Sequence, residues 1–113
     1  MGRLFVYGTL APGRSNHHVL AGLEGSWQPA AIRGILHPEG WGAALGYPAV
    51  VLDPQAGWVE GQVFSSRELE RAWRRLDAFE GSAYRRVKTT ARLSDGRQVE
   101  CFVYELAQAG VQR

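Results

Sequence analysis

The spacing of hydrophobic residues predicts one clear helix in the second half of the chain. Apolar side chains recur at helical spacing in the set Leu69, Ala72, Trp73, Leu76 and Phe79. This spacing gives the helix one buried face, and we expect the helix to end at about Phe79. Ser65 and Glu68 stand before it at the spacing of a capping box, which indicates its N-terminus. A shorter helix with a polar N-cap is predicted over residues 17–20.

Elsewhere the pattern is that of β-strands separated by turns. The predicted strands are residues 4–7, 27–36, 49–52, 58–64, 84–93 and 98–106. The first is apolar throughout, as in a strand buried on both faces, and Asp95-Gly96 predicts a tight hairpin between the last two. Gly61 shares a face with Val59 and Val63 and indicates a close approach of two backbones. These elements predict an α+β fold, a small mixed β-sheet curled into a barrel with one long and one short helix.

The length and composition indicate one ordinary globular domain. The chain has 113 residues, of which 45% are hydrophobic and 21% are charged, and this balance excludes a mostly disordered protein. We expect a single domain over residues 1–113, with a core at about 3–106 and a frayed tail at 107–113. The sequence contains no internal repeat or linker that would divide it.

The charge of the chain gives no indication of a nucleic-acid partner. The formal net charge is only +2, from 13 basic and 11 acidic residues. Four arginines do cluster on the predicted long helix, at positions 67, 71, 74 and 75. Glu70 precedes Arg74 by four residues, and Glu68 precedes Arg71 by three. A solvated helix face with ion pairs is therefore favoured over a phosphate-binding patch.

Cysteine, histidine and serine usage argues against several kinds of site. Cys101 is the only cysteine, so it cannot form an internal disulfide, and its apolar surroundings make it a small buried hydrophobe rather than a nucleophile. His17 and His18 are adjacent, and His37 has no cysteine or paired acid at ligand spacing. We therefore expect no metal and no cofactor. A serine hydrolase is unsupported, because the Gly-x-Ser-x-Gly motif is missing.

The chain also lacks the pattern of a targeting or membrane segment. It starts with Met1-Gly2-Arg3 and enters a short apolar run, without the features of a secretory signal. No stretch approaches the roughly 20 apolar residues of a membrane span. We expect a cytoplasmic protein without a membrane partner, and nothing in the sequence indicates its oligomeric state.

Glu80 is an acid at a position where the helical spacing calls for an apolar residue. It follows Leu76 by four positions and Leu69 by eleven, so it points along the buried face if the helix continues. Loss of water and the negative end of the helix dipole would then raise its pKa, as a general acid or base requires. The alternative is an earlier helix end, with Gly81 left-handed and the carboxylate in water. The spacing leaves both interpretations open.

The segment Tyr7-Gly8-Thr9-Leu10 is a second candidate site. It puts consecutive backbone N–H groups at the end of a buried strand. A concavity of this kind suits a carboxylate, a phosphate or a developing oxyanion. A tight turn with no ligand is the alternative interpretation of the same residues.

Together these residues resemble the γ-glutamylcyclotransferase-like family. The resemblance rests on Val6-Tyr7-Gly8-Thr9-Leu10 and on Leu76-Asp77-Ala78-Phe79-Glu80-Gly81 followed by Tyr84 and Arg85. Further matches in the family's order and spacing are Pro12-Gly13, Asn16-His17-His18, Gly46-Tyr47-Pro48-Ala49, Val59-Glu60-Gly61-Gln62-Val63 and Val103-Tyr104. The resemblance covers about residues 3–106. Thr9 stands where many members carry serine, a change that keeps the hydroxyl group.

The resemblance implies a γ-glutamyl cyclotransferase, an enzyme of the acyltransferase or lyase type that releases 5-oxoproline and a free amine from a γ-glutamyl compound. It implies that Glu80 is the catalytic acid/base. It also implies that Tyr7, Gly8, Thr9 and Leu10 bind the α-carboxylate and amine region of the substrate, and that Tyr84 and Tyr104 line the cavity. Such a reaction needs no enzyme nucleophile, because the substrate's own α-amine attacks its γ-carbonyl.

Two other functions remain open on the sequence. A non-catalytic small-molecule-binding domain would keep the cavity without turnover, since a fold does not fix a function. A different amine-bearing acyl substrate would be processed by the same acid/base logic. Glu80 together with an intact loop at residues 7–10 favours the cyclotransferase, while the amine half of the substrate is not encoded in any recognisable motif.

Overall fold

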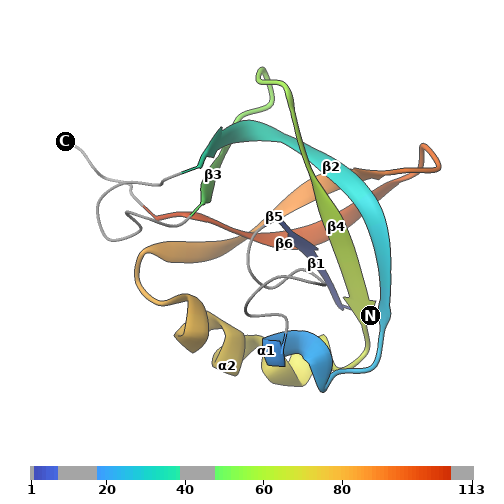
Figure 1. The fold of residues 1–113 in the computed structure, drawn as a ribbon, viewed down its shortest axis with the longest axis vertical. Helices are drawn as coiled ribbons and strands as arrows, with labels where there is room; N and C mark the ends of the chain where they lie inside the picture. Colours follow the sequence, from blue (N-terminus) through green and yellow to red (C-terminus); the bar gives the residue numbers. More distant parts are fainter. Residues whose placement is uncertain (1, 8–17, 39–47, 108–113) are drawn as a thin grey trace.

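The computed structural model describes residues 2–7, 18–38 and 48–107 of the chain. In chain order its elements are β1 (Gly2–Val6), α1 (His18–Ala21), β2 (Ser26–His37), β3 (Ala49–Leu52), β4 (Trp58–Ser66), α2 (Leu69–Glu80), β5 (Tyr84–Leu93) and β6 (Gln98–Leu106) (Figure 1). The predicted order of elements is confirmed, and the bounds of β3, β5 and β6 are those predicted. Among these residues, neither helix is long and apolar enough to cross a membrane.

The strands close into a barrel, which confirms the prediction of a mixed sheet curled into a barrel. Strand β1 pairs antiparallel with β4 and parallel with β6, β2 pairs antiparallel with β4 and β5, and β5 and β6 form a hairpin. These pairings complete a ring in the order β1-β4-β2-β5-β6 (Figure 1). Strand β3 is added between β2 and β6. The turn at Gly96 has a positive φ of 93°, which explains the glycine in the predicted hairpin.

The interior of the barrel is filled by aliphatic and aromatic side chains from all parts of the ring. The buried members of this cluster are Phe5, Ala30, Ile32, Val50, Val59, Val63, Ala91, Leu93, Cys101 and Val103. The predictions for Cys101, which is buried, and for the first strand, which is buried on both faces, are thus confirmed. Gly61 marks the predicted close approach, because a Cβ there would lie 2.5 Å from the carbonyl oxygen of Val6.

Both helices pack against the outside of the barrel and form a second core there (Figure 1). Leu69, Ala72, Trp73 and Leu76 supply the buried face of α2, as the helical spacing predicts. The prediction for the last apolar position is wrong. Phe79 is 44% exposed, because the helix continues by one residue and Glu80, four positions after Leu76, takes the partly buried position in the last turn.

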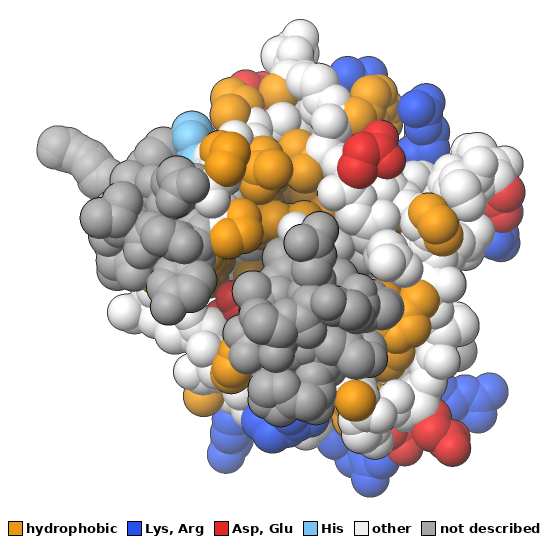
Figure 2. Space-filling view, viewed as in Figure 1, with side chains coloured by type: hydrophobic (Ala, Val, Ile, Leu, Met, Phe, Trp, Pro, Cys, Tyr) orange, Lys and Arg blue, Asp and Glu red, His pale blue; other side chains and the backbone are white. Residues whose placement is uncertain are grey.

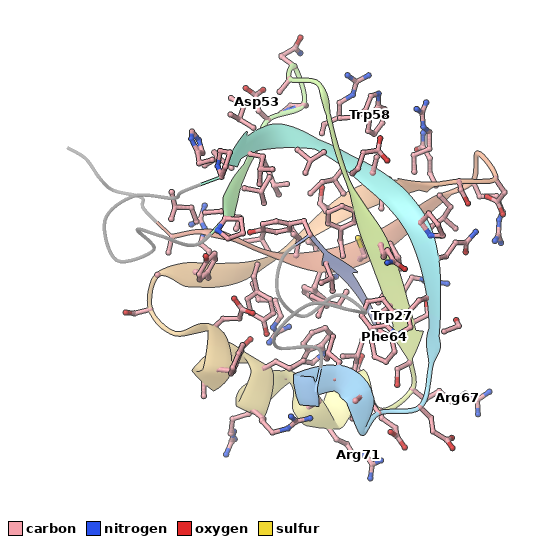
Figure 3. All side chains as sticks on the ribbon, viewed as in Figure 1. Trp27, Asp53, Trp58, Phe64, Arg67 and Arg71 are labelled. Carbon is pink, nitrogen blue, oxygen red and sulfur yellow. The ribbon has the colours of Figure 1, made fainter. Side chains whose placement is uncertain are left out.

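The start of α2 differs from the predicted capping box. The N-cap residue, Glu68, receives no side-chain cap, and Ser65 does not act as one. The Ser66 hydroxyl accepts a hydrogen bond from the Glu68 N–H at 3.0 Å and donates to the carbonyl of Glu24. The predicted ion pair between Arg71 and Glu68 is present at 3.7 Å. Figure 3 shows Arg67 and Arg71 pointing away from the body of the protein, as on a solvated face.

Charged and apolar side chains are distributed differently on the face shown in Figure 2. Hydrophobic side chains gather in its upper half, and Lys and Arg side chains lie mainly around its rim. Near the top of the barrel Trp58 is 37% exposed, and the guanidinium groups of Arg33 and Arg92 lie 4.2 and 4.3 Å from its ring. Arginine on this surface is therefore partly engaged in stacking.

Candidate functional site

Glu80 is the last residue of α2, and Gly81 ends the helix immediately after it. Gly81 has a φ of 78°, and its N–H donates a hydrogen bond of 3.0 Å to the carbonyl oxygen of Asp77. Glu80 therefore stays in the last helical turn, where it is partly buried. Its carboxyl group makes no hydrogen bond or ion pair with another described residue. Burial raises its pKa from 4.5 to about 7, so the carboxylate does not swing freely into water.

The Tyr7 hydroxyl joins three strands next to this helix end. It accepts a hydrogen bond from the Val50 N–H at 3.1 Å and donates one to the carbonyl oxygen of Tyr104 at 2.7 Å. Burial raises the pKa of Tyr7 well above its usual value, and the charge of Glu80 adds to the rise. Tyr7 thus remains neutral at ordinary pH, and the charge of Glu80 acts on it although the two predicted site residues are far apart in the sequence.

The two predicted cavity tyrosines occupy different environments. Tyr84 is partly buried and its hydroxyl donates to the carbonyl oxygen of Pro48 at 2.8 Å. Tyr104 is only 5% exposed and belongs to the core between α2 and the barrel. Its hydroxyl donates to Asp77 Oδ1 at 2.6 Å. Burial raises the pKa of Tyr104, and the charges of Asp77 and Glu80 contribute. Tyr104 therefore lies close to Glu80 and Tyr7, and Tyr84 lies close to Tyr7.

Asp77 and Arg86 form an ion pair that the sequence analysis did not anticipate. Arg86 Nε lies 2.9 Å from Asp77 Oδ1, and Arg86 Nη2 lies 3.2 Å from Asp77 Oδ2. The guanidinium carbon of Arg86 is 4.4 Å from the Trp73 ring centroid and 4.8 Å from that of Phe102. This pairing holds the pKa of Asp77 below its usual value. The one sequence signal was that Asp77 precedes Glu80 by three residues, on the same side of the helix.

Glu105 is a second acid close to Tyr7 that the sequence analysis missed. It is 7% exposed. One of its oxygens accepts from the Leu52 N–H at 3.0 Å, and the other accepts from Arg85 Nη2 at 3.0 Å. Its charge adds to the rise in the pKa of Tyr7. Arg85 pairs with Glu105 and so joins β5 to β6.

The remaining predictions for the site concern anion and metal binding. Gly8, Thr9 and Leu10 lie outside the described residues, as do His17 and the predicted N-cap of the short helix. Within residues 2–7, 18–38 and 48–107, no three His, Cys, Asp or Glu side chains are grouped as metal ligands. The described part of the site therefore offers one carboxyl group with a near-neutral pKa beside hydrogen-bonded tyrosines, which is suited to proton transfer.

Comparison with known proteins places this arrangement in context. Residues 4–113 match the family model described as gamma-glutamyl cyclotransferase, AIG2-like. The bovine protein named gamma-glutamylaminecyclotransferase is 38% identical over 113 residues, which cover 92% of this chain and 65% of the bovine protein. The chain thus spans slightly less than two thirds of that relative.

Solved structures show the same fold. An AIG2-like protein of Mus musculus has a TM-score of 0.75 and 26% identity, over 98% of this chain and 80% of the mouse chain. YkqA from Bacillus subtilis has a TM-score of 0.73 and 28% identity, over 94% of this chain and 36% of the YkqA chain. The barrel with its external helices is therefore shared with proteins of different lengths.

Proposed function

The chain belongs to the gamma-glutamyl cyclotransferase, AIG2-like family, and we propose that it is a γ-glutamyl cyclotransferase. In the proposed reaction the α-amine of a γ-glutamyl compound attacks its own γ-carbonyl carbon. A new C–N bond closes the five-membered ring of 5-oxoproline, the bond to the outgoing nitrogen breaks, and a free amine leaves. The observation that carries the proposal is the partly buried carboxyl group of Glu80, which has no hydrogen-bond or ion-pair partner in the described part of the chain and has its pKa raised to about 7.

Such a pKa suits a residue that must both take and give a proton. The substrate's α-amine enters as an ammonium group and must lose a proton before it can attack. The outgoing nitrogen must gain a proton before it can leave as an amine. A carboxyl group titrating near neutral pH exists in both forms at working pH, so Glu80 would serve first as base and then as acid.

The surrounding residues divide between binding and support. We assign the α-carboxylate and the developing oxyanion to the backbone N–H groups of Gly8, Thr9 and Leu10. Tyr7, at the end of β1, sets where that loop begins, because its hydroxyl is bonded to Val50 and Tyr104. Tyr84 would line the cavity.

The amine half of the substrate is proposed from the relatives alone. The bovine relative is named for γ-glutamylamines, so a γ-glutamylamine is the first substrate class to test. γ-Glutamyl amino acids and other amine-bearing acyl compounds are the next, because the same ring closure needs only a free α-amine and a γ-carbonyl.

Release of 5-oxoproline tests the proposal directly. The purified chain would be incubated with γ-glutamylamines and γ-glutamyl amino acids, and 5-oxoproline would be measured by mass spectrometry against a protein-free blank. We expect release by the wild type and a loss of roughly 100-fold or more in Glu80→Gln. Glu70→Gln is the matched control, because it makes the same change on the exposed side of the same helix.

Two results would contradict the proposal. Undiminished release by Glu80→Gln would remove Glu80 from the chemistry. Calorimetric binding of γ-glutamyl compounds without release of 5-oxoproline would favour the alternative, a small-molecule-binding domain of the same fold that has no turnover.

A further inference from the structure

The end of α2 is tied to the barrel through the side chain of Asp77. Its two carboxylate oxygens accept three hydrogen bonds, two from Arg86 on β5 and one from the Tyr104 hydroxyl on β6. Asp77 therefore contacts both strands of the β5–β6 hairpin from the last turn of the helix. Charge-assisted and bidentate bonds of this kind fix geometry more tightly than a single neutral bond.

Arg86 is itself held in place. Its guanidinium carbon lies 4.4 Å from the ring centroid of Trp73 on α2 and 4.8 Å from that of Phe102 on β6, and the two rings pack edge to face with their centroids 5.1 Å apart. The side chain of Arg86 is only 23% exposed. A stacked, partly desolvated arginine loses less freedom on binding a carboxylate than an arginine in water does.

The connection continues from Asp77 to Tyr7. Tyr104 donates its hydroxyl to Asp77, while its backbone carbonyl accepts the hydroxyl of Tyr7. One residue thus contacts the helix end through its side chain and Tyr7 through its backbone. The bonds run without a gap from Arg86 through Asp77 and Tyr104 to Tyr7.

The carboxyl group of Glu80 forms no hydrogen bond or ion pair with the other residues that the structure describes. Its position therefore depends on the helical turn that carries it, and Asp77 is the residue of that turn that is bonded to the barrel. The charge of Glu80 adds to the rise in the pKa values of Tyr7 and Tyr104.

We propose that Asp77 and Arg86 are a positioning pair, which through Tyr104 holds the Glu80 carboxyl group at a fixed place beside Tyr7. The catalytic consequence of this inference rests on the proposed function, whereas the placement of Glu80 by the Asp77–Arg86 pair does not. Neither residue need touch the substrate, since both would act by limiting the movement of the last turn of α2. A displacement of about 1 Å at a catalytic group is enough to cost roughly 100-fold in rate.

The experiment compares Asp77→Asn, Arg86→Gln and the double variant in two measurements. The first is the kinetics of 5-oxoproline release from a γ-glutamylalkylamine. We expect kcat to fall roughly 10- to 100-fold with KM changed by less than about 2-fold, and the double variant to be no worse than the poorer single variant, because the two residues act as a unit. Tyr104→Phe removes one bond only and should lower kcat by roughly 3- to 10-fold.

The second measurement is the titration of the Glu80 carboxyl carbon by NMR, with its resonance identified by its loss in Glu80→Gln. In the wild type we expect a midpoint near the pKa of about 7. If the last turn loosens in Asp77→Asn, water reaches Glu80 and the midpoint should fall toward the ordinary value. This result is obtained whether or not the protein turns over a substrate, so it separates failure of the positioning role from failure of the proposed function.

Asp95→Asn is the matched control, because Asp95 also forms an ion pair with an arginine, Arg97, at 2.8 Å in the β5–β6 turn. It should leave kcat and the Glu80 titration as in the wild type. The inference is overturned if Asp77→Asn and Arg86→Gln lower only the melting temperature, with the Glu80 midpoint and kcat unchanged. Should Asp77→Asn fail to fold, an unchanged Glu80 midpoint in the milder Tyr104→Phe variant would overturn it equally.

Discussion

The end of α2 and the corner between β3, β5 and β6 each place a glutamate near Tyr7. The two acids differ in whether their carboxylate oxygens have hydrogen-bond partners among the described residues. At the corner, Glu105 is 7% exposed, and its oxygens accept hydrogen bonds from the Leu52 N–H and from Arg85. At the helix end, Glu80 is partly buried and has no hydrogen-bond or ion-pair partner among the described residues. Both charges add to the rise in the pKa of Tyr7.

Burial alone does not identify a functional acid. A buried carboxylate with hydrogen-bond partners on both oxygens stabilises the strands that supply its partners, and it has less hydrogen-bonding capacity left for a substrate. An acid that is desolvated and left unpaired has a raised pKa and oxygens that are open to a proton donor. The first description fits Glu105 and the second fits Glu80.

Removing the two carboxylates in turn should have opposite effects on turnover. Glu80→Gln keeps the size of the side chain but cannot carry a proton, so kcat should fall by roughly 100-fold or more while KM changes little. Glu105→Gln should keep kcat within about 3-fold of the wild type, because its role is structural. Steady-state kinetics of both variants on one γ-glutamylamine measures this, and a reversal of the two outcomes would contradict the comparison.

The stability of Glu80→Gln relative to the wild type should depend on pH. The raised pKa means that folded Glu80 binds its proton more tightly than the unfolded chain does, so ionisation of Glu80 opposes folding. The wild type should therefore lose stability relative to the variant as the pH rises from 4.5 to about 7. Above that range the difference should be constant. Thermal unfolding at a series of pH values measures it, and a difference that does not change with pH would contradict the assigned pKa.

Tyr7→Phe should separate support of the site from its chemistry. The change leaves the Val50 N–H without its acceptor and the Tyr104 carbonyl without its donor. Loss of these partly buried bonds should cost about 2 kcal/mol of unfolding free energy. Denaturant unfolding measures the cost, with Tyr84→Phe as a control that removes the hydroxyl bond to the carbonyl oxygen of Pro48. A larger loss in the control would show that the Tyr7 hydroxyl does not join the strands as described.

Glu105→Gln should have a modest effect on stability. The glutamine oxygen can still accept the Leu52 N–H, so the lost interaction is the ion pair with Arg85. Because the Arg85 side chain is 64% exposed, water replaces much of what is lost, and we expect a cost of about 1 kcal/mol. Denaturant unfolding gives the value. A variant more stable than the wild type would show that the hydrogen bonds of Glu105 do not offset the cost of burying its carboxylate.

The local elements of this fold were predictable because each depends on neighbouring residues. Apolar runs and the Asp95-Gly96 turn gave β5 and β6 their bounds, and the spacing of Leu69, Trp73 and Leu76 gave α2 its buried face. The start of α2 was misplaced by one serine. The Ser66 hydroxyl accepts a hydrogen bond from the Glu68 N–H and also donates to the carbonyl of Glu24, 42 residues away, and no local pattern contains that contact.

The candidate site was predictable only in part, for the same reason. Glu80 could be singled out because an acid in an apolar stripe is a local irregularity, and Tyr7 because a strand ends beside it. Asp77 looked like an ordinary polar helix residue. Its partners, Arg86 and Tyr104, lie nine and 27 residues away, and they meet it only because the hairpin closes the barrel under α2.

The pH dependence of kcat/KM for a γ-glutamylamine tests the central claim, that Glu80 transfers protons with a near-neutral pKa, most directly. Glu80 must be ionised to accept the first proton, so kcat/KM should rise with pH along a single limb centred on a pKa of about 7. Measurements from about pH 5 to 9 cover the range needed. A profile without a limb near 7, or a limb of the same position retained in Glu80→Gln, would contradict the account.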